Sequence, residues 1–426
     1  MTTLKKTVLF SMLLLAFASC KDDEVTPQKA MATFTVNVEN VLAPASYLAS
    51  GTTNFLAPGE SQTITFNAGK GQFLSFATMY VQSNDLFFGF DDSGLQLYDD
   101  MGAAVTGDVT AQVKLWDAGT EVNEEPGVGP NQAPRQAGPN TGMTENGVVQ
   151  LVNDGFTYPA VASLIKLTLA HDGGTMFTLT LDNISGSSSI PSPLAPGNWV
   201  VAGMDTPLFT EGQAASAGLE GIAEDGDNSK MTTRLTDATG FVSPFAPGVY
   251  AVHSMDVNPI FTNGAGDKGQ GLESLAEGGD PSALNTSLTG AMGISTNGVF
   301  NTPVGASAPG PLMPGNSYSF TFDAEDGDYL SIATMLVHTN DLFYAFGENG
   351  IALFQNGSPV TGDVTGNVQL WDAGTEVNEY PGAGNNQPAR GGGTTGTDEN
   401  GNVMPVNDGF TYPPVNQAIK VTITAM

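Results

Sequence analysis

The ten residues Leu115-Trp-Asp-Ala-Gly-Thr-Glu-Val-Asn-Glu124 recur unchanged as Leu370 to Glu379. Each copy follows a short apolar run and leads into a long polar stretch, a pattern that predicts a strand followed by a loop. Gly119 lies inside the first copy, where a tight turn requires a positive φ. Asp117 and Glu121 stand on either side of this turn, so the loop presents two carboxylates.

Other motifs also occur twice. Asn84-Asp-Leu-Phe87 recurs at Asn340 to Phe343, and Asn153-Asp-Gly-Phe-Thr-Tyr-Pro159 recurs at Asn407 to Pro413, with nearly constant spacing between the copies. A constant spacing of this length indicates two homologous domains and not a solenoid of short units. We predict domains at residues 32–172 and 173–426.

The second predicted domain carries an additional segment at about 187–295, which is itself duplicated. Leu208-Phe-Thr-Glu-Gly212 matches Ile260-Phe-Thr-Asn-Gly264. Each half contains apolar residues at helical spacing, which predicts two short helices, one closed by Gly226 and the other by Gly278. On this prediction the first domain is a shortened copy.

The fold class follows from short segments in which polar and apolar residues alternate. Fifty-three glycines and 26 prolines separate these segments. The pattern predicts an all-β protein built from two antiparallel β-sandwich domains. The clearest alternation is at Thr33–Glu39, Ile165–Leu169, Phe177–Leu181, Ser317–Phe322 and Ile419–Ile423.

The chain is strongly acidic, with 44 acidic and 13 basic residues and a formal net charge of −31. Such a surface repels nucleic acid and attracts cations, so we expect no nucleic-acid partner. Its one cysteine, Cys20, leaves no disulfide to stabilise the domains. Folding therefore depends on buried apolar cores, which a chain of this length can provide.

Residues 1–19 have the parts of a secretory signal, because Lys5 and Lys6 precede an apolar run. Phe17-Ala-Ser-Cys20 resembles a bacterial lipobox, which implies cleavage before Cys20 and lipid attachment to its thiol. Lys21-Asp-Asp-Glu24 resembles the signal that sends Bacteroidetes-type lipoproteins to the outer face of the outer membrane. Residues 20–31 then form a linker; the alternative is a plain signal peptide followed by a charged neck.

A metal site is predicted from the acids near the repeated loop. Calcium binds six to eight oxygens and accepts carboxylates together with backbone carbonyls. An Asp before a glycine turn also commonly bonds its own backbone, which is the alternative without a metal. The predicted ligands are Asp85, Asp117 and Glu121 in the first domain and Asp341, Asp372 and Glu376 in the second.

These motifs resemble the spondin N-terminal domain. That family carries Pro-Ser-Pro-Asp-Trp followed by Asp-Ala-Gly-Thr-Asp, and here Ser83-Asn-Asp-Leu-Phe87 precedes Asp117-Ala-Gly-Thr-Glu121. The resemblance implies a β-sandwich related in shape to C2 domains, a role in extracellular adhesion, and calcium bound by the six acids named above. Leu86 and Leu342 replace the family's Trp, and Glu replaces its last Asp.

The remaining candidates favour structural roles. Trp116 and Trp371 are predicted to pack at strand ends, with an exposed binding platform as the alternative. His171, His253 and His338 are not grouped, and the sequence holds no nucleophilic triad, zinc spacing or phosphate loop. We place the acids of the two short helices on exposed helix faces: Glu220, Glu224, Asp225, Glu273 and Glu277.

The sequence therefore predicts a non-enzymatic lipoprotein, anchored to the outer membrane through Cys20 and binding an extracellular protein or glycan. Two alternatives stay open. One is a hydrolase or glycan-processing accessory in which Asp117 and Glu121 act as paired carboxylates. The other is a structural spacer that displays another chain.

Overall fold

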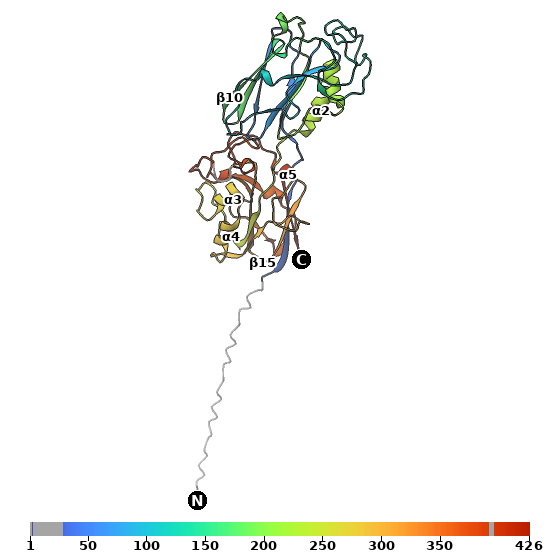
Figure 1. Ribbon diagram of the computed structural model, residues 1–426. Coiled ribbons are helices and arrows are strands. Elements are labelled where there is room, and N and C mark those ends of the chain that lie inside the picture. Colours follow the sequence, from blue (N-terminus) through green and yellow to red (C-terminus); the bar gives the residue numbers. More distant parts are fainter. Residues whose placement is uncertain (1, 3–28, 392–395) are drawn as a thin grey trace.

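The computed structural model describes residues 2, 29–391 and 396–426. They form two β-sandwich domains that lie end to end (Figure 1), and their sheets are antiparallel. The predicted all-β class is therefore confirmed. The signal peptide, Cys20 and most of the linker lie outside the described residues.

The first domain packs a four-stranded sheet against a larger one. The four-stranded sheet has the order β3 (Ser61–Asn67), β11 (Met176–Asn183), β10 (Ile165–Gly173) and β7 (Gly107–Asp108). The larger sheet has the order β2 (Tyr47–Thr53), β12 (Gly197–Ala202), β4 (Phe73–Met79), β5 (Leu86–Gly89), β8 (Lys114–Asp117) and β9 (Gln150–Leu151), and β6 (Leu95–Gln96) pairs with β4.

The second domain repeats this pattern. Its four-stranded sheet has the order β15 (Ser317–Glu325), β1 (Met31–Asn40), β24 (Ile419–Ala425) and β21 (Gly362–Asp363). Its larger sheet has the order β14 (Ile294–Phe300), β13 (Gly248–Ser254), β16 (Asp328–Met335), β17 (Leu342–Ala345), β22 (Gln369–Asp372) and β23 (Met404–Pro405), and β18 (Ile351–Ala352) pairs with β16. A small hairpin joins β19 (Phe354–Gln355) to β20 (Ser358–Pro359).

The strand pairing corrects the predicted domain boundaries. β1 lies between β15 and β24, so the first strand of the chain belongs to the second domain. β12, predicted to lie in the second domain, pairs with β2 and β4 of the first. The first domain thus spans roughly residues 46–240 and is inserted between β1 and β13. The strand corresponding to β1 in the first domain is β11, which follows β10, so the two domains are circular permutants of one another.

Helices cover the outer face of each larger sheet. In the first domain these are α1 (Ala217–Glu220), the π-helical turn η4 (Gly221–Asp225) and α2 (Ser229–Ala238); in the second they are α3 (Leu272–Gly278) and α4 (Ser282–Leu288). The supposed duplicated insert is therefore one helical segment per domain, and the first domain is not a shortened copy. Gly226 closes the first segment in the left-handed conformation as predicted, whereas Gly279, and not Gly278, does so in the second.

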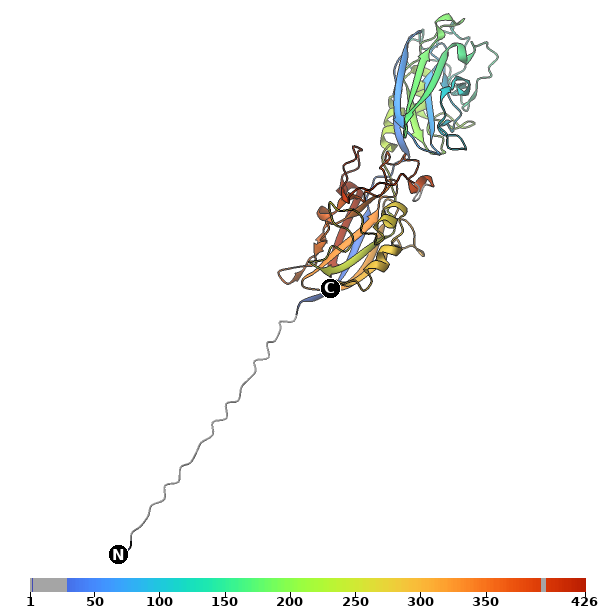
Figure 2. The same ribbon diagram turned by 90° about the vertical axis from the view of Figure 1, so that its left-hand side faces the viewer.

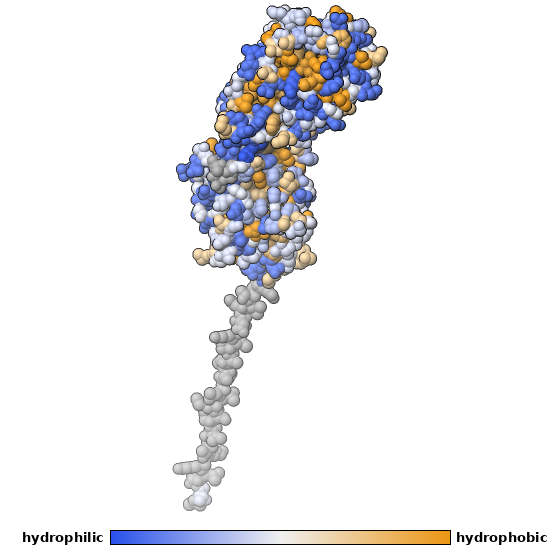
Figure 3. All heavy atoms as spheres, viewed as in Figure 1, coloured by the Kyte–Doolittle hydropathy of each residue, from blue (hydrophilic) through white to orange (hydrophobic). Residues whose placement is uncertain are grey.

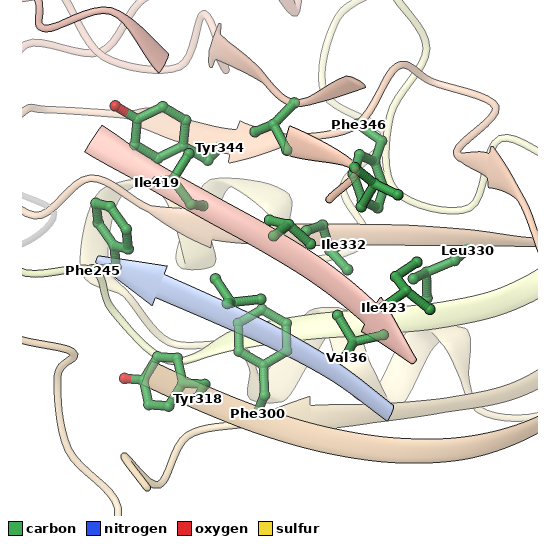
Figure 4. Close-up of a cluster of buried hydrophobic side chains, with 14 of the residues drawn as sticks. Val36, Phe245, Phe300, Tyr318, Leu330, Ile332, Tyr344, Phe346, Ile419 and Ile423 are labelled. Atoms are coloured by element: carbon green, nitrogen blue, oxygen red, sulfur yellow. The ribbon is translucent and has the colours of Figure 1, made fainter. Parts of the chain in front are cut away.

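Buried apolar residues separate the layers of each domain. Figure 4 shows the core of the second domain, in which Val36 of β1 packs among side chains such as Ile332 and Ile423. β1 alternates buried and partly exposed residues because one face covers this core, whereas β4 is buried almost throughout because it is covered on both faces. One short helix, α5 (Val415–Ala418), precedes β24.

The domains contact each other through a loop of the second domain (Figure 2). Arg390 donates to the Lys70 carbonyl at 2.8 Å, and the Lys70 amide donates to Asn385 at 2.8 Å. Within the described residues, no helix is both long and apolar enough to cross a membrane.

Candidate metal centres

The two halves of the predicted site meet at the end of a strand pair. Asp85 immediately precedes β5, and Asp117 ends β8. The strands are antiparallel, with Leu86 opposite Asp117, and the Ala118 amide donates to the Asp85 carbonyl at 3.1 Å. This register brings the two aspartates together although 31 residues separate them in the sequence.

Asp85 is fully buried, with 0% of its surface exposed. Its Oδ2 accepts hydrogen bonds from the backbone amides of Thr120 at 2.7 Å and Glu121 at 3.0 Å, and from the Thr120 hydroxyl at 3.2 Å. Its Oδ1 has no hydrogen-bond partner. A buried, unpaired carboxylate oxygen is costly, so it requires an explanation.

Asp117 lies beside Asp85 and organises the turn. Its Oδ1 accepts from the Gly119 amide at 2.7 Å, and Gly119 has the predicted positive φ of 69°. Its Oδ2 accepts from the side-chain amide of Asn123 at 2.9 Å. The Oδ1 of Asn123 is buried and, like that of Asp85, unpaired.

The second domain reproduces this geometry. Asp341 Oδ2 accepts from the amides of Thr375 and Glu376 at 2.8 and 3.1 Å, and Asn378 donates to Asp372 at 2.6 Å. The Oδ1 atoms of Asp341 and Asn378 are again buried without partners. The same two unpaired oxygens therefore flank the loop aspartate in both domains.

Glu121 directs its carboxylate to other partners. Its Oε1 accepts from the Gly142 amide at 2.7 Å, and its Oε2 lies 3.4 Å from the Asn84 side-chain amide. A side chain at Gly142 would collide with this carboxylate. Glu376 makes the same contact with Gly396 at 2.8 Å.

The predicted trio of acids is therefore divided in this geometry. Asp85 and Asp117 lie together, as do Asp341 and Asp372, but the glutamate carboxylates are bound separately. In the described part of the chain, no three Asp, Glu, His or Cys side chains gather closely enough to hold one ion. Sequence reasoning missed the asparagine, although Asn123 and Asn378 lie inside the repeated ten residues.

Two helix acids depart from their predicted place. Glu224 is 3% exposed and Glu277 is 4% exposed, so neither lies on a solvated helix face. Each is covered by the loop of its own domain, next to Thr120 or Thr375. The prediction failed for these residues because helical spacing alone does not show which loop packs on the helix.

In both domains, burial and mutual repulsion favour the protonated, uncharged form of these carboxyl groups when no cation is present. Burial, with repulsion from Asp85, raises the pKa of Asp117 to about 7, and burial, with repulsion from Asp372, raises the pKa of Asp341 to about 7. Burial also raises the pKa of Glu224 and Glu277 to about 7, and the charges of Glu121 and Glu376 add to the respective shifts. A bound cation would reverse this preference.

The long loops after the repeated motif are held by internal hydrogen bonds. Glu124 accepts from the Asn131 amide at 2.9 Å and from its side chain at 2.6 Å, and Glu379 binds Asn386 in the same way. In the second domain, an open pocket of about 420 Å³ reaches the site. Its acidic lining consists of Asp372, Glu399 and Asp408, and Asn378 also borders it.

The other sequence candidates have structural roles. Trp116 is buried and donates to the Phe90 carbonyl at 3.0 Å, and Trp371 donates to that of Ala345 at 3.3 Å, which confirms the packing prediction. Among the histidines, His253 is buried and lies 2.9 Å from the Ser331 hydroxyl.

No protein-family model fits the chain, and no curated protein matches its sequence significantly.

Proposed function

We propose that this protein is a surface lipoprotein whose two β-sandwich domains each bind calcium and which binds a ligand outside the cell. The observation that carries the proposal is the pair of buried, unpaired oxygens beside the loop aspartate, present in both domains. The resemblance to the spondin N-terminal domain and the acidic composition point the same way.

The residues at this site suit a calcium ion. Asp85, Asp117 and Asn123 would hold it in the first domain, and Asp341, Asp372 and Asn378 in the second. Carboxylate and amide oxygens are typical calcium ligands. The ion would neutralise the two aspartates and fix the loop that begins at Asp117.

Binding fits these carboxylates better than hydrolysis. Paired-carboxylate hydrolysis requires an acid and a base that both face the substrate. Asp117 uses both oxygens for bonds to Gly119 and Asn123, and Glu121 is bound to Gly142. The two carboxylates are therefore bonded to different parts of the loop and do not form an acid and base pair directed at one substrate.

The first domain offers the better ligand surface. Val128 is 64% exposed and Met143 is 73% exposed, and both lie on the long loop next to the site. The residue that corresponds to Val128 in the second domain is Ala383, which is buried beside Gly69 of the first domain. On the face seen in Figure 3, hydrophobic residues are more abundant on the first domain. An apolar rim of this kind favours a protein ligand over a glycan.

The order of the domains suits display from a membrane. β1 begins at the end of the second domain that lies away from the first (Figures 1 and 2). An anchor that precedes β1 would therefore place the second domain nearer the membrane and the first domain farther out.

Thermal unfolding of the intact chain with and without calcium tests the ion. Calcium at about one hundred times its Kd should stabilise each site by about 2.7 kcal/mol, a rise of roughly 5–10 °C for domains of this size. The double variant Asp85→Asn with Asp341→Asn keeps the oxygen that accepts the backbone bonds and should lose the part of the rise that calcium at these two sites supplies. Asp100→Asn, at an exposed aspartate, is the matched control.

The change in stability that this double variant causes without calcium provides a second test. In a chelator above about pH 7, the same double variant should be more stable than the unaltered chain, because it removes aspartates whose charged form is disfavoured by burial. A variant that destabilises the protein equally with and without calcium would refute a role for Asp85 and Asp341 in ion binding.

Ligand binding is tested by probing extracellular-protein and glycan arrays with the intact chain, with and without calcium. We expect calcium-dependent binding that falls when Met143 is changed to Glu but not when the corresponding Thr397 is changed to Glu. Binding to neither array would favour the structural spacer.

A further inference from the structure

The helical segment of the first domain buries a carboxylate that the calcium site does not use. Glu224 belongs to η4 and is 3% exposed, and its Oε2 has no hydrogen-bond partner. An acid on a short surface helix ordinarily faces water. This one faces the loop of the repeated motif.

A second carboxylate lies opposite. Glu121 is 2% exposed. Burial raises the pKa of Glu224, and the negative charge of Glu121 raises it further, whereas a hydrogen bond from the Thr120 side chain lowers it. The Asn84 amide lies 3.4 Å from Glu121 Oε2, too long for a strong bond. The two largely buried acids are therefore close enough for their charges to interact, and the 2.7 Å bond from the Gly142 amide offsets only part of the cost of burying Glu121.

The surrounding chain encloses the pair. Gln136 donates to Asp225 at 2.9 Å, and the side chain of Asn140 lies 3.4 Å from Glu220. The long loop thus rests on the helical segment beside Glu224. Gly142 of the same loop bonds Glu121, so three separate segments converge on the two carboxylates.

The second domain places Glu376 and Glu277 in the corresponding positions, although of the two helix acids only Glu224 has a buried oxygen without a partner. Both are buried, Thr375 takes the place of Thr120, and Gly396 bonds Glu376. The acids of each pair come from a loop and a helix distant in sequence, so the arrangement depends on the tertiary structure of each domain and not on a single turn.

We propose that each domain holds a second divalent cation of the calcium type, between Glu121 and Glu224 in the first and between Glu376 and Glu277 in the second. Two carboxylates and the Thr120 or Thr375 hydroxyl supply hard oxygen ligands, and water completes the shell. The ion joins the helical layer to the loop of the repeated motif. This second site does not depend on calcium at Asp85 and Asp117.

Calcium titration calorimetry on the intact, chelator-treated chain tests the proposal by stoichiometry. The unaltered chain should bind two ions per domain. Glu224→Gln with Glu277→Gln should remove one ion per domain and leave the other, whereas Asp85→Asn with Asp341→Asn should remove the complementary one. Glu125→Gln, at an exposed glutamate, should remove none.

The outcomes separate the two sites. If the Glu224 and Glu277 variant binds as many ions as the unaltered chain, the second site is refuted, whatever the aspartate variant does. Loss of ions only in the glutamate variant would support the second site and contradict the first. Circular dichroism checks folding, and Glu121→Gln with Glu376→Gln provides an independent pair that should lose the same ions.

Discussion

Asn123 donates its side-chain amide to Asp117 Oδ2 at 2.9 Å and thereby holds its own oxygen, Oδ1, unpaired beside the same aspartate. Asn378 and Asp372 repeat this relationship at 2.6 Å. An asparagine that is fixed by one end and free at the other is suited to complete a cation site.

Replacing this asparagine should weaken calcium binding without unfolding the domain. We expect Asn123→Ala to lower the calcium affinity of the first domain about 10- to 100-fold, the range seen when groups that support a metal are removed. Calorimetry on the intact chain measures it. The matched control is Asn131→Ala, which removes a bond to Glu124 outside the site. An equal loss of calcium affinity in the two variants would contradict a ligand role for Asn123.

Stability in the absence of calcium should depend on pH in a defined direction. Folding raises the pKa of Asp117 from 3.8 to about 7, so the folded state holds a proton that the unfolded state releases. The contribution of protonated Asp117 to the free energy of unfolding is fully present below about pH 4 and is lost as pH rises towards and through 7. Thermal unfolding in a chelator should therefore show a melting temperature that declines over this range.

Calcium should reverse that trend, because the ion competes with protons for the same carboxylates. Apparent affinity should increase with pH up to about 7 and then level off. A calcium affinity that does not change between about pH 5 and pH 8 would show that the ion binds elsewhere.

Asn40 tests the assignment of the first strand to the second domain. Its side chain donates to the carbonyls of Ser243 and Leu312 at 2.9 and 3.0 Å in a buried setting. Asn40→Ala should destabilise the second domain by about 1–3 kcal/mol, because two buried carbonyls lose their partner. Hydrogen–deuterium exchange should increase in residues 243–426 and remain unchanged in 46–240.

The corresponding change in the other domain is Asn183→Ala, which removes bonds to the carbonyls of Leu56 and Ser192. It should increase exchange in residues 46–240 alone. If Asn40→Ala instead increased exchange there, β1 would belong with the first domain, as the sequence repeats had indicated.

Gly119 should not tolerate a side chain. Its φ is 69°, and a Cβ would lie 2.7 Å from the Val148 amide nitrogen. Gly119→Ala should destabilise the first domain by about 1–3 kcal/mol and weaken calcium binding by displacing the loop. Gly59→Ala is the control, because Gly59 also has a positive φ but has open space around it. If both variants lost similar stability and calcium affinity, backbone strain alone would explain the effect of Gly119→Ala.

The sequence predicted those features that depend on local pattern. The alternation in Thr33–Glu39 predicted β1 correctly, and Gly119 took the positive φ expected of a tight turn. The pairing of Asp85 with Asp117 also follows from the two repeated motifs, since β5 and β8 are neighbouring strands.

Features that depend on which distant segment a strand or helix packs against could not be predicted from local sequence pattern. The same alternation fits β1 beside β15 or beside β3, so the pattern could not show which domain the strand completes. Glu224 is buried only because the loop after β8 covers its helix. Glu121 was placed with the aspartates by its spacing from Asp117, whereas Gly142, on a loop without a regular pattern, binds its carboxylate.

Anomalous diffraction from crystals of the intact chain grown with calcium tests the central claim most directly. A peak in contact with Asp85 Oδ1 and Asn123 Oδ1, and a second in contact with Asp341 Oδ1 and Asn378 Oδ1, is the predicted result. Ordered calcium elsewhere, with water or no density at these four oxygens, would contradict it.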